Sequence, residues 1–132
     1  MSNQRDIIET ALAFGLAVGF YFTLTIVLNT SMPLVSVVSE SMEPVMHRGD
    51  LLLIVGTEDY NVGDVAIYQK PNMKITIIHR IIQKRDDGFV FKGDNNNAPD
   101  PYLVKKSEIK GEAIFVAPLV GYPRLALQLV GI

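Results

Sequence analysis

The sequence contains no cysteine, which excludes disulfide bonds, cysteine nucleophiles, iron–sulfur clusters and zinc sites built on thiolates. It holds only two histidines, His47 and His79, so a metal site made of several histidines is excluded as well. Basic residues are not in excess either: 12 Lys and Arg stand against 14 Asp and Glu, for a net charge of -2. This balance provides no basic surface for phosphates, and we expect no nucleic-acid partner. At 132 residues the chain has room for one domain.

A long uncharged stretch lies near the amino terminus, although 20% of all residues are charged. The eighteen residues from Ala11 to Leu28 carry no charge, and extending the stretch back to Ile7 gives twenty-two residues with one glutamate. As a helix these lengths span about 27 to 33 Å, the thickness of the hydrocarbon core of a bilayer. A cleavable signal peptide would have a shorter apolar region and a cleavage site, and a buried helix of a soluble domain would keep a polar face. The pattern therefore predicts a transmembrane helix over 7–28.

The distribution of positive charge predicts the orientation of this helix. Arg5 and the amino terminus precede it, and no Lys or Arg follows it until Arg48. Positive residues favour the cytoplasmic side of a membrane. We expect a single-pass integral membrane protein with its body on the extracytoplasmic side.

From about Met32 onward, short β-branched and aromatic segments alternate with turn formers. Asp87-Gly88 between two such segments predicts a β-hairpin. We expect a mainly β fold, with one small domain over 32–132 tethered by the amino-terminal helix. The apolar end, 122–132, is expected either to lie in the membrane interface or to pack as a terminal helix. The expected strands are 35–39, 51–55, 64–68, 75–82, 89–92 and 113–117.

The residues able to carry chemistry are few. Ser41 follows an apolar strand segment, and Pro44 makes the turn behind it rigid. His79 lies in a very apolar segment, and Asp94 and Asp100 lie on one polar loop. Taken singly, each has a plainer role: a cap, a packed core histidine and two turn formers. Together they supply a nucleophile, a base and an orienting acid.

Five ordered motifs make a family resemblance specific. In this order, the sequence resembles type I signal peptidases of the archaeal and endoplasmic-reticulum branch, in which the base is histidine rather than lysine. The motifs are Ser-Glu-Ser-Met-Glu-Pro (39–44), Arg-Gly-Asp (48–50), Gly-Asp-Val (63–65), Ile-His-Arg-Ile (78–81) and Lys-Gly-Asp-Asn-Asn (92–96).

The resemblance implies a serine endopeptidase that cleaves signal peptides from secretory preproteins after small residues, beside the lipid bilayer and without a cofactor or metal. It implies Ser41 as nucleophile, His79 as general base and Asp100 as orienting acid, with Asp94 supporting the loop or sharing that role. The turn at 48–50 is then structural. His47, in a polar turn beside Arg48, is not expected to be the base.

The backbone N–H of Ser41 and the hydroxyl of Ser39 are the expected oxyanion donors. An extended substrate is expected to pair with the strand that holds Val35, Val37 and Val38, in the manner of an added β-strand. Small pockets beside this strand would select small residues.

Other readings remain at this point. The chain fits an inactive membrane scaffold, a membrane protease with another substrate, or a non-enzymatic membrane-anchored β domain that binds a partner. Whether it works alone or with other membrane subunits is also open. The plasma membrane is favoured as its location, with the endoplasmic reticulum as the alternative.

Overall fold

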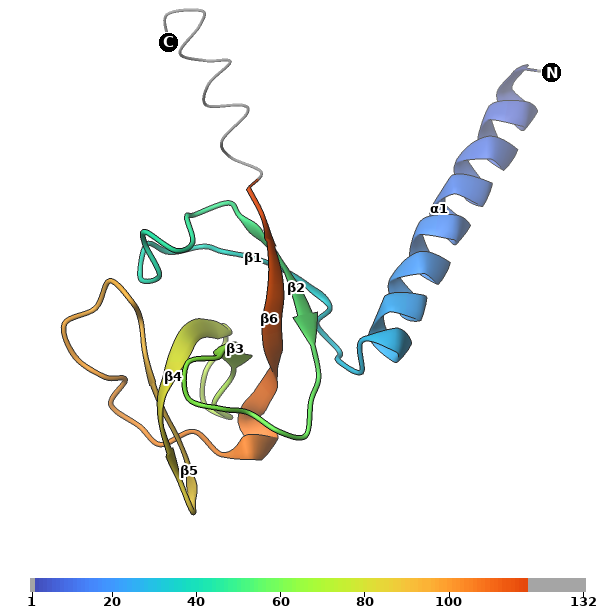
Figure 1. Cartoon of the computed structure of the whole chain (residues 1–132). Helices are drawn as coiled ribbons and strands as arrows, with labels where there is room; N and C mark the ends of the chain where they lie inside the picture. Colours follow the sequence, from blue (N-terminus) through green and yellow to red (C-terminus); the bar gives the residue numbers. More distant parts are fainter. Residues whose placement is uncertain (1, 119–132) are drawn as a thin grey trace, which may run out of the picture.

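The computed structural model describes residues 2–118 and consists of one helix followed by a β domain (Figure 1). The helix, α1, runs from Ser2 to Val27, and a short connection leads from it into the sheet. The transmembrane segment predicted over 7–28 lies within this helix except for its last residue. The predictions for 122–132 lie outside the described residues.

The β domain is built on one six-stranded sheet with the order β1-β2-β6-β3-β4-β5, in which all neighbours are antiparallel. A short 3-10 helix, η1 (Lys106–Glu108), precedes the last strand, which pairs in the middle of the sheet between β2 and β3. The mainly β fold is confirmed. The strands are β1 (Leu34–Ser36), β2 (Leu51–Val55), β3 (Val65–Tyr68), β4 (Ile77–Arg85), β5 (Gly88–Lys92) and β6 (Ile109–Ala117).

Each expected strand corresponds to an observed one, and the β4–β5 hairpin turns at Asp86 and Asp87 with Arg85 paired to Gly88. The largest difference at one strand end is in β6, which begins at Ile109 instead of Ala113, and β4 ends at Arg85 instead of Ile82. In the other direction, β1 ends at Ser36 instead of Ser39. After Ser36 the chain pairs with a turn rather than a strand: Val37 donates to the Asp50 carbonyl and accepts from the Gly49 N–H. Gly49 has a φ of 92°, a conformation that glycine adopts without strain.

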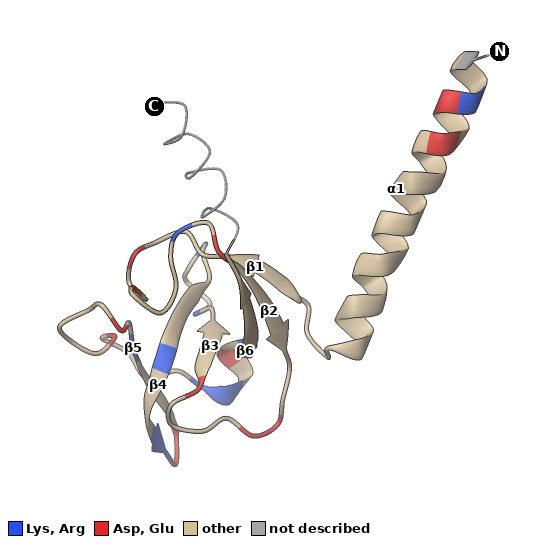
Figure 2. Ribbon diagram, turned by 45° about the horizontal axis from the view of Figure 1, so that its top comes forward, with Lys and Arg blue, Asp and Glu red and all other residues tan. Residues whose placement is uncertain are grey.

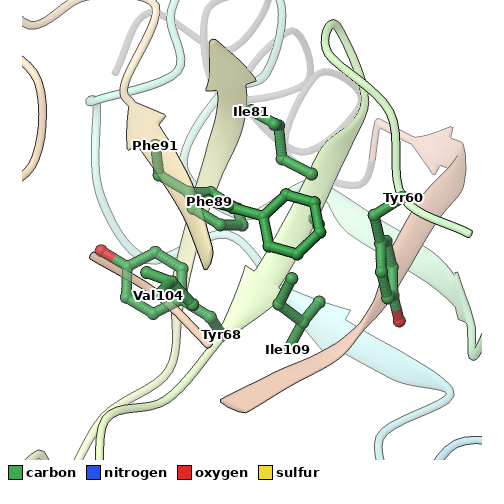
Figure 3. Packing of buried hydrophobic residues seen from close by; sticks show 8 residues of the cluster. Tyr60, Tyr68, Ile81, Phe89, Phe91, Val104 and Ile109 are labelled. Atoms are coloured by element: carbon green, nitrogen blue, oxygen red, sulfur yellow. The ribbon is translucent and has the colours of Figure 1, made fainter. Parts of the chain in front are cut away.

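Two hydrophobic clusters form the core, and β3 lies between them because all four of its residues are buried. Ala66 and Tyr68 face the first cluster, while Val65 and Ile67 face the second. Figure 3 shows the first cluster, in which the aromatic rings of Tyr60, Tyr68, Phe89 and Phe91 pack with aliphatic side chains. A strand covered on both faces is held rigidly, and β3 is the strand that β4 pairs with at His79.

Helix α1 is exposed along its length, and its charged residues lie only near the amino-terminal end (Figure 2). Its 26 residues make a rod of about 39 Å, longer than the hydrocarbon core of a bilayer. Within residues 2–118, this is the one helix long and apolar enough to cross a membrane. An exposed apolar helix is unstable in water, so these features fit a membrane anchor.

Candidate active site

Ser41 lies in the turn that follows β1, and its position is set by buried neighbours. Met42, the next residue, is 1% exposed and packs in the second hydrophobic cluster. The Ser41 carbonyl accepts a hydrogen bond from the backbone N–H of Asn95 at 2.8 Å. The segment is therefore held by the buried side chain of Met42 and by the hydrogen bond from the 93–96 loop.

His79 reaches Ser41 from β4, the strand next to the edge strand β5. It lies on β4 opposite Ala66 of β3, and only 8% of it is exposed. Its Nε2 lies 3.1 Å from the Ser41 Oγ, within hydrogen-bond distance. Ala66 is itself completely buried in the first hydrophobic cluster, so the strand position beside the imidazole is packed.

Asp100 lies on the other side of the imidazole. Its two carboxylate oxygens are 2.9 and 2.7 Å from the His79 Nδ1, and its side chain is 7% exposed. Its backbone N–H donates to the Phe91 carbonyl at 2.8 Å, which ties the loop to β5. Ser41, His79 and Asp100 thus form one hydrogen-bonded line from a hydroxyl through an imidazole to a carboxylate.

Asp94 does not join this line. It forms a two-point ion pair with Arg80, whose Nε and Nη2 donate to its oxygens at 2.9 and 2.8 Å. The same arginine donates to the Gly63 carbonyl. Because strand alternation points Arg80 away from His79, Asp94 is bound on the opposite face of β4 from the imidazole. The hydrogen bonds from Arg80 hold the pKa of Asp94 below its ordinary value.

The 93–96 loop also contacts the segment that holds Ser41 through its backbone. The Asp94 N–H points to the Met42 sulfur, and the Asn95 side chain donates to the Glu40 carbonyl. Gly93 approaches the Ser41 carbonyl so closely that a Cβ at this position would lie 2.7 Å from the oxygen. Reasoning from sequence missed this clamp, since Asn and Gly in a polar loop look like ordinary turn formers.

Sequence reasoning also missed the contact between Tyr68 and Asp100. Tyr68 is fully buried at the end of β3, and its hydroxyl donates to the Asp100 Oδ2 at 2.5 Å. Burial and this hydrogen bond raise the pKa of Tyr68 far above its ordinary value, so the phenol stays protonated. A hydroxyl at the end of an otherwise apolar strand was the available signal.

Ser39 and the three valines take different positions. The Ser39 Oγ lies 3.0 Å from the Ser41 Oγ. Val37 and Val38 line an apolar groove of about 280 Å³, while Val35 packs against the second hydrophobic cluster and is not among the groove residues. The groove is lined by Val37, Val38, Ser39, Ser41, Met42, Ile75, Thr76, Ile77, Ile78, His79 and Asn96.

His47 lies apart from the imidazole site, in a turn closed by Asp50. Its backbone N–H donates to the buried Asp50 carboxylate at 2.8 Å, and its ring is largely exposed. The residues 48–50 lie in a turn, and the contact that closes it is the hydrogen bond from the His47 N–H to the Asp50 carboxylate.

The Arg80–Asp94 pair predicts a dependence of stability on acid. Since the folded-state pKa of Asp94 is lowered, the pair stabilises the fold above about pH 4, the ordinary range of Asp, and this contribution disappears as the pH falls through the lowered value. Asp94→Asn should lower the free energy of unfolding by about 1 to 3 kcal/mol at pH 6. Denaturant unfolding of the full chain in detergent at pH 6 and pH 2 measures both values.

The difference in the free energy of unfolding between wild type and Asp94→Asn should be much smaller at pH 2 than at pH 6. Asp59→Asn is the control, because Asp59 is exposed and its contact with Lys84 is 3.5 Å long. An equal gap at both pH values would contradict the prediction.

Comparison with known proteins shows the relationships of this chain. The Peptidase S24-like family matches residues 16–114. The signal peptidase complex catalytic subunit SEC11 of Lachancea thermotolerans is 38% identical, over 84% of this chain and 76% of that protein. The subunits of the same name from Chaetomium globosum and Leptosphaeria maculans are 32% and 33% identical, over 97% and 93% of this chain and 85% and 79% of their own lengths.

The chain belongs to the type I signal peptidase family, in its endoplasmic-reticulum branch. It is therefore a serine endopeptidase, as the resemblance implied. The relatives and the exposed apolar helix support a single-pass membrane protein, whereas the expected preference for the plasma membrane finds no support in them.

Proposed function

We propose that this enzyme cleaves signal peptides from secretory preproteins with Ser41 as nucleophile, His79 as general base and Asp100 as orienting acid. The carrying observation is the line of contacts in which His79 lies 3.1 Å from the Ser41 hydroxyl and 2.7 Å from the Asp100 carboxylate. The names of the relatives support the substrate class, because each is the catalytic subunit of a signal peptidase complex.

In the first half of the reaction, His79 carries its proton on Nδ1, where Asp100 accepts the hydrogen bond, so that Nε2 is free to accept another proton. Nε2 takes the proton of the Ser41 hydroxyl as Oγ bonds to the carbonyl carbon of the scissile peptide bond. The resulting imidazolium donates that proton to the leaving nitrogen, and the C–N bond breaks. The mature protein leaves with a new amino terminus, and the signal peptide stays as an ester on Ser41.

In the second half, water takes the place of the leaving amine. His79 accepts a proton from the water, whose oxygen bonds to the ester carbon, and then returns that proton to the Ser41 Oγ as the ester bond breaks. The ionised Asp100 stabilises the imidazolium in both halves. Its buried position strengthens this effect, because the local dielectric is lower than that of water.

The negative charge that develops on the carbonyl oxygen needs donors, and Ser39 and the Ser41 N–H are the proposed pair. The Ser39 hydroxyl lies 3.0 Å from the attacking oxygen, which brings it within reach of a second oxygen bonded to the same carbon. One such donor typically contributes about 2.7 to 4 kcal/mol to transition-state stabilisation.

The groove beside Ser41 is proposed to hold the end of the signal peptide in an extended conformation. Val37 uses both its backbone groups on Gly49 and Asp50, so strand alternation turns the backbone groups of Val38 the other way, toward an added strand. Val38 and Ile75, 68% and 64% exposed, supply apolar surface for the peptide. The groove has a volume of about 280 Å³, and both Ser41 and His79 line it.

Helix α1 is proposed as the transmembrane anchor, with the β domain of 32–132 on the extracytoplasmic side. A tethered enzyme meets a membrane-bound substrate without a search through solution. Since the relatives are subunits of a complex, we also propose that other membrane subunits are partners of this chain.

Incubation of the purified full chain, in detergent, with a preprotein whose signal peptide ends in Ala-x-Ala tests the function. Mass spectrometry of the products should find one cut, directly after the last alanine. A preprotein with tryptophan in place of that alanine should stay intact. An uncut alanine preprotein would leave a binding domain as the better account, and a cut elsewhere would contradict the proposed substrate.

A further inference from the structure

Tyr68 is a polar side chain in an apolar environment. It is fully buried in the first hydrophobic cluster, beside Phe91 (Figure 3). Between ring centroids, it lies 4.6 Å from Phe91 and 6.2 Å from Tyr102. A hydroxyl buried in such surroundings costs free energy unless it finds a partner, and a phenylalanine would fill nearly the same space. A tyrosine rather than a phenylalanine at position 68 therefore indicates a role for the hydroxyl.

The hydroxyl has one partner among the described residues, the Oδ2 of Asp100 at 2.5 Å. The same oxygen lies 2.7 Å from the His79 Nδ1. One carboxylate oxygen thus accepts from a phenol on β3 and an imidazole on β4, while the other lies 2.9 Å from the imidazole. Because packing fixes the phenol ring, its hydroxyl stays in one place, and the hydrogen bond fixes the orientation of the Asp100 carboxylate.

We propose that Tyr68 is a positioning residue for the line formed by Ser41, His79 and Asp100, one that holds the Asp100 carboxylate aimed at His79. This inference rests on the proposed function, since it needs Asp100 to be the orienting acid. Hydrogen bonds donated to a carboxylate favour its charged form, and charge-assisted ones are stronger than neutral ones. Without Tyr68, the carboxylate would keep the histidine bond but lose the contact that fixes its rotation.

The groups around Asp100 indicate that Tyr68 is the residue that positions its carboxylate. The groups that face Asp100 are His79 from β4 and Tyr68 from β3, with Tyr102 packed behind the phenol. The other acid on the loop, Asp94, is neutralised by Arg80. Among the described residues, no lysine or arginine pairs with Asp100, so the phenol is its second donor besides the imidazole.

Tyr68→Phe, assayed on the full chain with the alanine preprotein, tests the proposal. Loss of one hydrogen bond to a charged group should lower kcat about 10-fold and leave KM unchanged. The carboxylate loses a donor and attracts the imidazole proton more strongly, so the acidic limb of the pH profile of kcat/KM should move to higher pH. Tyr60→Phe, in the same cluster and 4% exposed, is the matched control and should show neither change.

A second variant keeps the test valid if Tyr68→Phe folds poorly. Site-specific 3-fluorotyrosine at position 68 preserves the hydroxyl and makes it a stronger donor, so the acidic limb should move to lower pH. Combining Tyr68→Phe with Asp100→Asn should cost much less than the sum of the two single losses, because both act through one contact.

Additive losses, or an acidic limb that stays in place in both Tyr68 variants, would overturn the role of Tyr68. The wild-type enzyme and the Ser41→Ala variant, run alongside, separate this from a failure of the proposed function. If wild type cleaves and Ser41→Ala does not, a normal Tyr68→Phe enzyme refutes only the positioning role.

Discussion

Replacing Ser41 by alanine is expected to abolish cleavage of the preprotein, with a fall in turnover of about 10⁶-fold. The change removes the oxygen that lies 3.1 Å from the His79 Nε2 and takes away little volume. Ser41 is half-buried and is not part of either hydrophobic cluster, so the fold should persist. Product analysis by mass spectrometry measures the loss, and circular dichroism of the same sample verifies the fold.

Ser39→Ala is the matched control, because it removes the same group two residues away and 3.0 Å from the Ser41 Oγ. Because Ser39 is a proposed oxyanion donor, Ser39→Ala should lower kcat by a factor of about 10² to 10³. A normal Ser41→Ala enzyme would reject the mechanism. An inactive Ser39→Ala enzyme together with an active Ser41→Ala enzyme would exchange the two roles.

Asp100→Asn is expected to lower turnover about 10⁴-fold, whereas Asp94→Asn should change it by less than about 10-fold. An amide at position 100 loses the charge that stabilises the imidazolium, and it can hold the histidine in the wrong tautomer. Asparagine at position 94 still accepts one hydrogen bond from Arg80, so the loop should keep its place at some cost in stability. Values of kcat for both variants, at a pH where wild type is fully active, measure the difference.

A matched pair of this kind separates the two acids of one loop, since the chemical change is identical. Equal stability losses in both variants would not explain a thousand-fold difference in turnover. If Asp94→Asn proved the more damaging change while still folded, the roles of the two aspartates would be reversed.

The sequence predicted the elements of this chain well because their signals are local. An uncharged run long enough for a bilayer, β-branched segments of four to eight residues and turns rich in Gly, Asn and Asp all depend on neighbouring residues. Boundaries were less accurate where pairing decides them. The strand expected over 35–39 ends at Ser36, because the partner of Val37 is a turn that carries Gly49 and Asp50.

The sequence by itself determined the elements, the family resemblance and the short set of residues able to carry the chemistry. Only the tertiary structure decided which acid faces His79. Asp94 and Asp100 lie on one loop and look alike in sequence, yet Arg80 and His79 lie on opposite faces of β4, and the path of the loop brings each acid to a different one. The contact of Tyr68 with Asp100 likewise joins residues 32 positions apart. Such contacts arise from packing across the sheet, which no local pattern encodes.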